Sequence, residues 1–188
     1  MAFKFYPVLA LLIVALLPLS CSSIKELNRN HGEIYMYGIV FDEENQPVSG
    51  AEVIINGKAV TFTDAQGRFI LTSKERNSFS LTLNKTGFEP VTGSFSFEPM
   101  QVIHLVMINS GQLVRRAERF MDEGFYPEVI NLCERALVLN PARYDASYLK
   151  ALALLRLRDY QNARKTLEEL QNLIGERDYI RLVLENIP

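Results

Sequence analysis

The chain has 188 residues, of which 48% are hydrophobic and 22% charged, and its formal net charge at pH 7 is −2. This length suffices for one domain or two small ones, and the charge balance excludes a basic surface for nucleic acid. Two cysteines cannot form a disulfide framework, and His31 and His104 lack metal-ligand spacing. We therefore expect no catalytic residues, no metal site and no cofactor.

The N-terminal segment places one base, Lys4, before an apolar run at residues 8–19, which ends close to Cys21. Twelve helical residues rise about 18 Å, which is short of a bilayer core of roughly 30 Å. A short apolar run behind a basic start is typical of a secretory signal rather than a membrane span. Small Ser20 before Cys21 favours cleavage between these two residues.

This pattern resembles the signal peptide of bacterial lipoproteins, in which the cysteine carries diacylglycerol and becomes the new N-terminus. Pro18 departs from the family, which usually has an aliphatic residue there. The resemblance implies a signal peptide at 1–20, lipidation of Cys21, a polar tether at 21–32 and, because Ser22 follows, the outer membrane. An ordinary secreted protein or an uncleaved anchor is the alternative.

Residues 33–108 contain seven short runs rich in β-branched and aromatic residues, separated by turn residues. Alternation such as Phe79-Ser80-Leu81-Thr82-Leu83 predicts strands with one buried face. The spacing predicts a seven-stranded antiparallel β-sandwich without helices.

Three turn motifs make this region similar to a known family. They are Gly38-Ile39-Val40-Phe41-Asp42, the stretch from Pro47 to Val53, and the stretch from Thr63 to Phe69, with "KTGFEP" around Gly87 in addition. Together they resemble the carboxypeptidase regulatory-like domain, which has a transthyretin-like fold. The resemblance implies a stability or docking module without catalytic residues.

Four acidic residues near these turns, Asp42, Glu43, Glu44 and Asp64, raise the alternative of a calcium site. Asp and Gly at such positions more commonly build turns, because the Asp side chain bonds the backbone two residues on. We therefore favour turns over a metal site.

Residues 109–188 change to a helical period of 3.6, and Asn109 or Ser110 can cap the first helix. A repeat appears when the sequence is shifted along itself so that Tyr126 corresponds to Tyr160, a spacing typical of helical repeats of roughly 34 residues. Small residues and an aromatic near the turn resemble the tetratricopeptide repeat (TPR). The fold class expected overall is all-β plus all-α, a sandwich followed by a short TPR-like α-α superhelix.

In such repeats the first helix of each pair lines a groove for a peptide or a partner helix. The residues that recur on this face include Glu118, Met121, Tyr148, Leu152 and Arg156. An amphipathic core explains the leucines equally well, whereas Tyr148 and Arg156 are residue types enriched at interfaces.

These features favour a non-enzymatic, lipid-anchored envelope protein that acts as a scaffold or assembly accessory and binds a protein or peptide partner. The protein is expected to contact the membrane through the lipid anchor and not to bind nucleic acid. Two helical repeats leave an apolar edge at the end of the stack, and a second copy of the protein is one way to cover it. The alternative is a surface protein that binds a ligand or carbohydrate through sandwich loops. A hydrolase would need a motif such as G-x-S-x-G or H-E-x-x-H, and neither is present.

Overall fold

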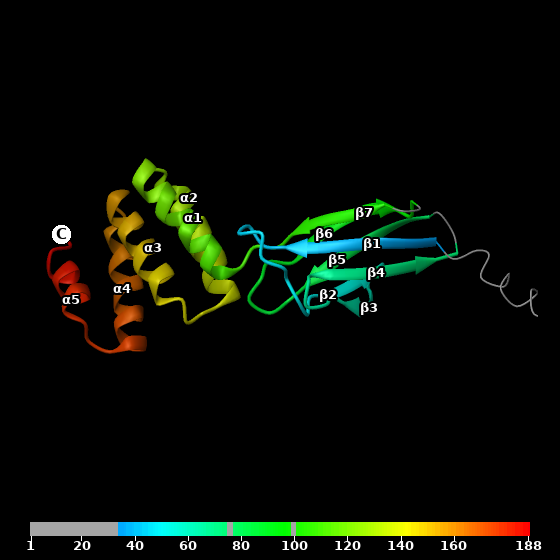
Figure 1. Cartoon of the computed structure of the whole chain (residues 1–188). Helices are drawn as coiled ribbons and strands as arrows, with labels where there is room; N and C mark the ends of the chain where they lie inside the picture. The colour runs from blue at the N-terminus through cyan, green and yellow to red at the C-terminus, as the bar shows by residue number, and fades with distance from the viewer. Residues whose placement is uncertain (1–33, 75–76, 99–100) are drawn as a thin grey trace, which may run out of the picture.

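The computed structural model describes residues 34–74, 77–98 and 101–188 and shows seven strands followed by five helices (Figure 1). The two groups of elements lie at opposite ends of the described molecule. The expected order of an all-β region and then an all-α region is confirmed. The signal peptide at 1–20, Cys21 and the tether at 21–32 lie outside the described residues.

The seven strands form two sheets. Their bounds are β1 Ile34–Phe41, β2 Glu52–Ile55, β3 Lys58–Phe62, β4 Arg68–Ser73, β5 Ser78–Asn84, β6 Val91–Ser96 and β7 Val102–Val106. One sheet has the order β4-β1-β7, and the other has the order β3-β2-β5-β6. The region is thus sandwich-like, with a three-stranded sheet packed against a four-stranded one.

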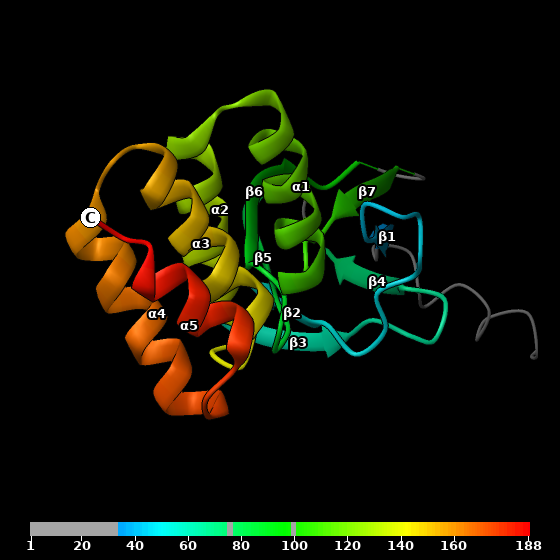
Figure 2. The same ribbon diagram turned by 90° about the vertical axis from the view of Figure 1, so that its left-hand side faces the viewer.

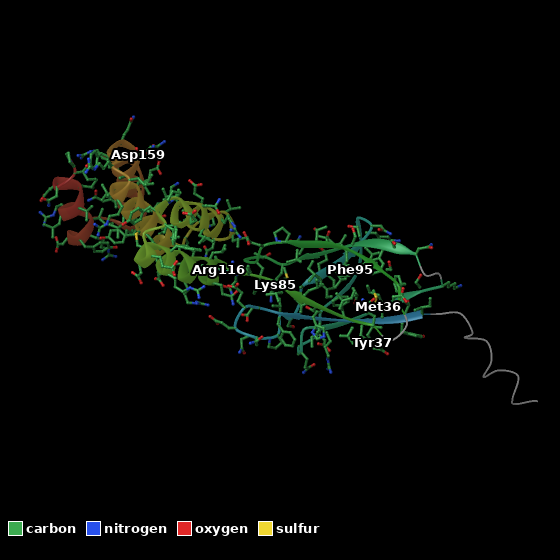
Figure 3. All side chains as sticks on the ribbon, turned by 90° about the horizontal axis from the view of Figure 1, so that it is seen from above. Met36, Tyr37, Lys85, Phe95, Arg116 and Asp159 are labelled. Atoms are coloured by element: carbon green, nitrogen blue, oxygen red, sulfur yellow. The ribbon has the colours of Figure 1, made fainter. Side chains whose placement is uncertain are left out.

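Alternation along the strands determines which side chains fill the space between the sheets. On β1, Met36 and Val40 are fully buried, while Tyr35 and Tyr37 are exposed. Figure 3 shows Met36 on the inner side of β1 and Tyr37 on its outer side. The buried residues of both sheets form one apolar cluster, which includes Leu81 on β5.

One strand pair differs from the wholly antiparallel arrangement that we expected. β7 runs parallel to β1, with Tyr37 opposite Val102 and Phe41 opposite Val106, whereas every other named strand pair of the described residues is antiparallel. A parallel pair requires a long crossover connection, and here five strands separate the two partners in sequence. Alternation within a strand does not encode the direction of its neighbour.

Asp42 and Asp64 form the turns that the sequence predicted. The Asp42 side chain accepts hydrogen bonds from the backbone N–H groups of Glu44 and Gln46, and Asn45 has a left-handed φ of 57°. The Asp64 side chain accepts from the backbone of residues 66 and 68. Each carboxylate therefore orders a turn, which is the role that the sequence favoured for these residues.

The five helices are α1 Ser110–Glu123, α2 Tyr126–Leu139, α3 Tyr144–Arg156, α4 Tyr160–Ile174 and α5 Asp178–Glu185. The starts of α1, α3 and α5 are evenly spaced along the chain. The same interval separates the starts of α2 and α4, from Tyr126 to Tyr160. The predicted period therefore governs the helix positions. α5 occupies the place of a third first helix and packs beside α3 and α4 (Figure 2).

Small buried residues allow the helices to approach one another closely. Ala117, Ala136 and Ala151 are fully buried, as is Cys133 on α2. Cys133 fills core space as a small apolar residue, as expected. In the part of the chain that the structure describes, no helix combines the length and apolar character needed to cross a bilayer.

The strands pass into the helices without a linker. Met107 is fully buried in the sandwich core, and the next residue, Ile108, packs against the core of α1 and α2. Asn109 then caps α1 through a capping box, in which its side chain accepts from the backbone of Gln112 and the Gln112 side chain accepts in return. A backbone hydrogen bond of 2.9 Å from Glu89 to Ile108 holds this junction.

Candidate functional site

The five predicted partner-binding residues lie on two neighbouring helices. Glu118 and Met121 belong to α1, while Tyr148, Leu152 and Arg156 belong to α3. The repeat places α1 and α3 at equivalent positions, so their exposed faces form one surface. We call this surface the α1–α3 face.

A hollow of about 360 Å³ lies on the α1–α3 face and is lined by Met121, Leu152, Leu155 and Arg156. The structure thus brings together three of the five predicted residues. Three apolar side chains form most of the lining, and Arg156 adds a positive charge. Such a hollow accepts an apolar side chain that stands next to a carboxylate.

Tyr148 has a different environment from the other predicted residues. Its ring packs edge-on against Tyr179 of α5, with a centroid distance of 5.2 Å and an interplanar angle of 90°. It also packs against an apolar cluster between α3, α4 and α5, which includes Leu167 and Ile180. Tyr148 therefore holds α5 in place beside the hollow rather than lining the hollow.

Glu118 lines a second, charged hollow of about 490 Å³ between the β1–β2 loop and α1. The full lining is Glu43, Glu44, Gln112, Arg115, Arg116, Glu118, Arg119 and Asp122. Glu118 and Met121 are three residues apart on α1, so Glu118 is the lining residue of the charged hollow that lies nearest to the apolar hollow on this helix.

Two ion pairs fix one wall of the charged hollow. Arg115 pairs with Glu44, and Arg116 pairs with Glu43, so the β1–β2 loop is tied to α1. The sequence placed Glu43 and Glu44 in a turn but gave no signal of this contact. Turn chemistry is local, whereas these partners are separated by more than seventy residues.

Gln112 lies at the base of the charged hollow and is only 2% exposed. Its side-chain oxygen accepts the backbone N–H of Asn109, but its Nε2 has no hydrogen-bond partner among the described residues. A buried amide donor without a partner costs free energy.

A third ion pair joins the sandwich to the helices through α2. Arg135 donates two hydrogen bonds of 2.7 Å to the carboxylate of Glu89, in a bidentate geometry. Hydrogen bonding to Glu89 raises the pKa of Arg135 above its ordinary value. Together with the pairs at Glu43 and Glu44, this contact holds the helices against one end of the sandwich.

The described residues contain one free cysteine, Cys133, and several carboxylates that belong to turns or ion pairs. Among them, no group of three or more His, Cys, Asp or Glu side chains is placed to hold a metal ion. Burial raises the pKa of the Cys133 thiol to about 12, so this residue is a poor nucleophile at neutral pH. A hydrogen bond from the backbone of Arg68 is the main cause that lowers the pKa of Asp64, which is a turn residue.

A separate hollow of about 400 Å³ lies in the sandwich itself, beside β3 and β4. Its lining includes Asn56, Val60, Ile70, Asn77 and Phe79. This is the place where the alternative expectation, a ligand bound by the sandwich, would apply.

Comparison with known families covers the sandwich and the start of α1. Residues 36–114 match the CarboxypepD_reg-like domain family, which agrees with the three turn motifs. Residues 36–114 are a CarboxypepD_reg-like domain. This CarboxypepD_reg-like domain therefore contributes one wall of the charged hollow, through Glu43 and Glu44. No curated protein matches the sequence.

Solved structures with distant similarity each cover less than half of the chain. A 3-chlorocatechol 1,2-dioxygenase from Rhodococcus opacus 1CP shares 12% identity over 42% of this chain and 60% of its own, with a TM-score of 0.34. The Bacillus anthracis TIE protein shares 13% identity over 42% of this chain and 17% of its own, with a TM-score of 0.36. The BcpA major pilin subunit of Bacillus cereus shares 16% identity over 41% of this chain and 28% of its own, with a TM-score of 0.33. This chain thus spans less than two thirds of each of these proteins.

Proposed function

We propose that this chain is a non-enzymatic, lipid-anchored protein of the bacterial cell envelope that holds a protein or peptide partner on its α1–α3 face. The observation that carries the proposal is the pair of hollows that α1 helps to line. One is apolar and contains Met121, and the other is charged and contains Glu118. In this role the protein acts as a scaffold or assembly accessory at the outer membrane.

The partner segment has a chemistry that the two hollows define. An apolar side chain fits between Met121, Leu152 and Leu155, and a nearby carboxylate reaches Arg156. Mixed charge in the second hollow then selects the orientation of the segment rather than adding much affinity.

The helical repeat supports this use of the surface. Helix starts at a constant spacing are what a TPR-like superhelix requires, and in such repeats the first helices line the binding groove. The sandwich, with a transthyretin-like arrangement, serves as the docking base of the helical unit. Three ion pairs between them support a fixed relative position.

The lipid anchor rests on the sequence around Cys21. Each buried methylene is worth about 0.8 kcal/mol, so two or more acyl chains hold a protein firmly on a bilayer. A Cys21→Ser variant should lose incorporation of labelled palmitate and leave the membrane fraction, as measured by fractionation. The anchor would be contradicted if the Cys21→Ser variant stayed in the membrane fraction and the unmodified chain incorporated no palmitate.

The groove is tested by crosslinking in cells followed by recovery of partners. A Leu152→Asp/Arg156→Glu variant places two negative charges in the apolar hollow and should lose the partner that the unmodified chain recovers. The matched control is Val138→Asp/Lys165→Glu, which makes similar changes at exposed positions of α2 and α4.

Equal recovery of every partner by both variants would contradict binding on the α1–α3 face. If recovery then depends instead on residues of the hollow beside β3 and β4, for example through Ser78→Trp, binding belongs to the sandwich. Circular dichroism of each variant shows whether its fold is intact.

A further inference from the structure

The outer face of the β4-β1-β7 sheet differs in chemistry from the outer face of the other sheet. Its outward positions, which we call the β4-β1-β7 face, are Tyr35, Tyr37, Ile39, Phe41, Arg68, Ile70, Thr72, Val102, His104 and Val106. None of the ten is acidic, and seven are aliphatic or aromatic. Five of these seven are 45–54% exposed.

The strand register makes these side chains neighbours. Ile70, Tyr37 and Val102 form one row across the three strands, and Arg68, Ile39 and His104 form the next. Cross-strand neighbours in a sheet stand about 5 Å apart, so the apolar side chains form a continuous surface. Soluble proteins rarely leave such a surface uncovered without a use for it.

The outer face of the four-stranded sheet provides the contrast. Hydroxyl groups of β5 and β6 pair across it, with Ser78 beside Ser96 at 3.3 Å and Thr82 beside Thr92 at 3.0 Å. Exposed Phe62 stands on β3 of the same sheet. The apolar character of the β4-β1-β7 face is therefore not a general property of this sandwich.

The position of the β4-β1-β7 face in the chain indicates what covers it. β1 starts at Ile34, only thirteen residues after Cys21, and it runs from the end of the sandwich that is far from the helices toward them (Figure 1). Thirteen residues span at most roughly 45 Å, so a bilayer anchored at Cys21 stays within reach of this face.

We propose that the β4-β1-β7 face rests on the lipid bilayer to which Cys21 anchors the chain. The inference rests on the proposed lipid anchor. Tyr35 and Tyr37 suit the interface, because a tyrosine ring enters the acyl boundary while its hydroxyl group stays among the headgroups. The absence of carboxylates avoids repulsion from anionic lipids, although Arg68 is itself paired with Asp64 at 3.1 Å.

A fluorescent probe on each face tests the proposal in the full chain. Val102→Cys on β7 and Ser94→Cys on β6 put the same thiol-reactive, environment-sensitive dye on edge strands of the two opposite faces. The protein is reconstituted in vesicles of phosphatidylethanolamine and phosphatidylglycerol with doxyl-labelled lipid as quencher. We expect severalfold stronger quenching and a blue-shifted emission at residue 102 only.

The unmodified chain is the labelling control. Cys133 is buried and its thiol has a raised pKa, so it does not compete for the dye. An acylated Cys21 does not react either. Dye uptake by the unmodified chain therefore reveals a free Cys21 and a failure of the proposed anchor, whereas equal quenching at residues 102 and 94 overturns the bilayer contact alone.

A second pair of variants separates lipid contact from self-association. Tyr37→Thr/Ile70→Thr removes apolar side chains from the β4-β1-β7 face and should reduce quenching at residue 102 to the level at residue 94. Phe62→Thr, on the other sheet, should leave it unchanged. Crosslinking of Val102→Cys between two copies by a short bismaleimide, without lipid quenching, would assign the face to a second copy and overturn the proposal.

Discussion

Gly38 makes room for an aromatic ring in the sandwich core. It stands opposite Phe69 on β4, and a Cβ atom at Gly38 would lie 2.0 Å from that ring. The sequence motif placed Gly38 in the first strand, but it did not show that the glycine is required by a side chain on another strand. Its role is therefore steric rather than conformational.

We expect Gly38→Ala to destabilise the protein by about 1–3 kcal/mol, because the ring of Phe69 must leave its place in a packed core. Urea unfolding followed by circular dichroism measures this change. Adding Phe69→Leu should recover part of the loss, since the smaller side chain frees the space. A Gly38→Ala variant as stable as the unmodified chain would contradict the packing.

Arg158 has the same place in the second helical pair as a glycine, Gly124, has in the first. Gly124 and Arg158 hold equivalent places in successive pairs, and both have a left-handed φ, of 83° and 62°. The backbone N–H of the residue that follows each left-handed position bonds a carbonyl five residues earlier, from Phe125 to Phe120 and from Asp159 to Leu154. Both helices thus end in a Schellman motif.

Arg158→Gly should therefore stabilise the protein by about 0.5–1 kcal/mol, because a left-handed backbone strains any residue that has a Cβ. Thermal unfolding gives the measurement, and the Tm should rise. The reciprocal change, Gly124→Ala, should lower it by a similar amount. A lower Tm for Arg158→Gly would mean that the arginine side chain stabilises the fold by more than the left-handed backbone destabilises it.

Between elements, the bidentate contact of Arg135 on α2 with Glu89 before β6 is the best-formed link of the junction. A double-mutant cycle with Arg135→Ala and Glu89→Ala should give a coupling energy of about 1 kcal/mol, since both side chains are partly shielded from solvent. The exposed pair Lys165–Glu169 on α4 is the control and should couple by about 0.3 kcal/mol or less. Equal coupling in both cycles would argue against a special role for the junction.

Local sequence patterns predicted the elements well. Period-2 alternation marks the strands, and the repeat period marks the helix starts, because both reflect which side chains a single element buries. The parallel direction of β7 against β1 was not predictable from these patterns, since direction depends on the whole path of the chain through two sheets. The same limit applies to the pairing of Glu89 with Arg135.

For the whole molecule, the helical repeat accounts for the position of three candidate residues around one hollow but not for their surroundings. Met121, Leu152 and Arg156 come together because equivalent helices present equivalent faces. The second hollow depends on where the β1–β2 loop meets α1, which no repeat encodes. Tyr148 also differs from the expectation of a freely presented interface residue, because α5 covers part of its ring through Tyr179.

The direct passage from Met107 to Ile108, together with the parallel pairing of β7 and β1, has a mechanical consequence. A load applied to the helices enters the sandwich at the C-terminal end of β7, while the chain before β1 resists at the opposite end. Force then acts along both strands in opposite directions and shears all their ladder hydrogen bonds at once instead of peeling them one after another. The sandwich is therefore expected to resist unfolding when it is pulled along these two strands.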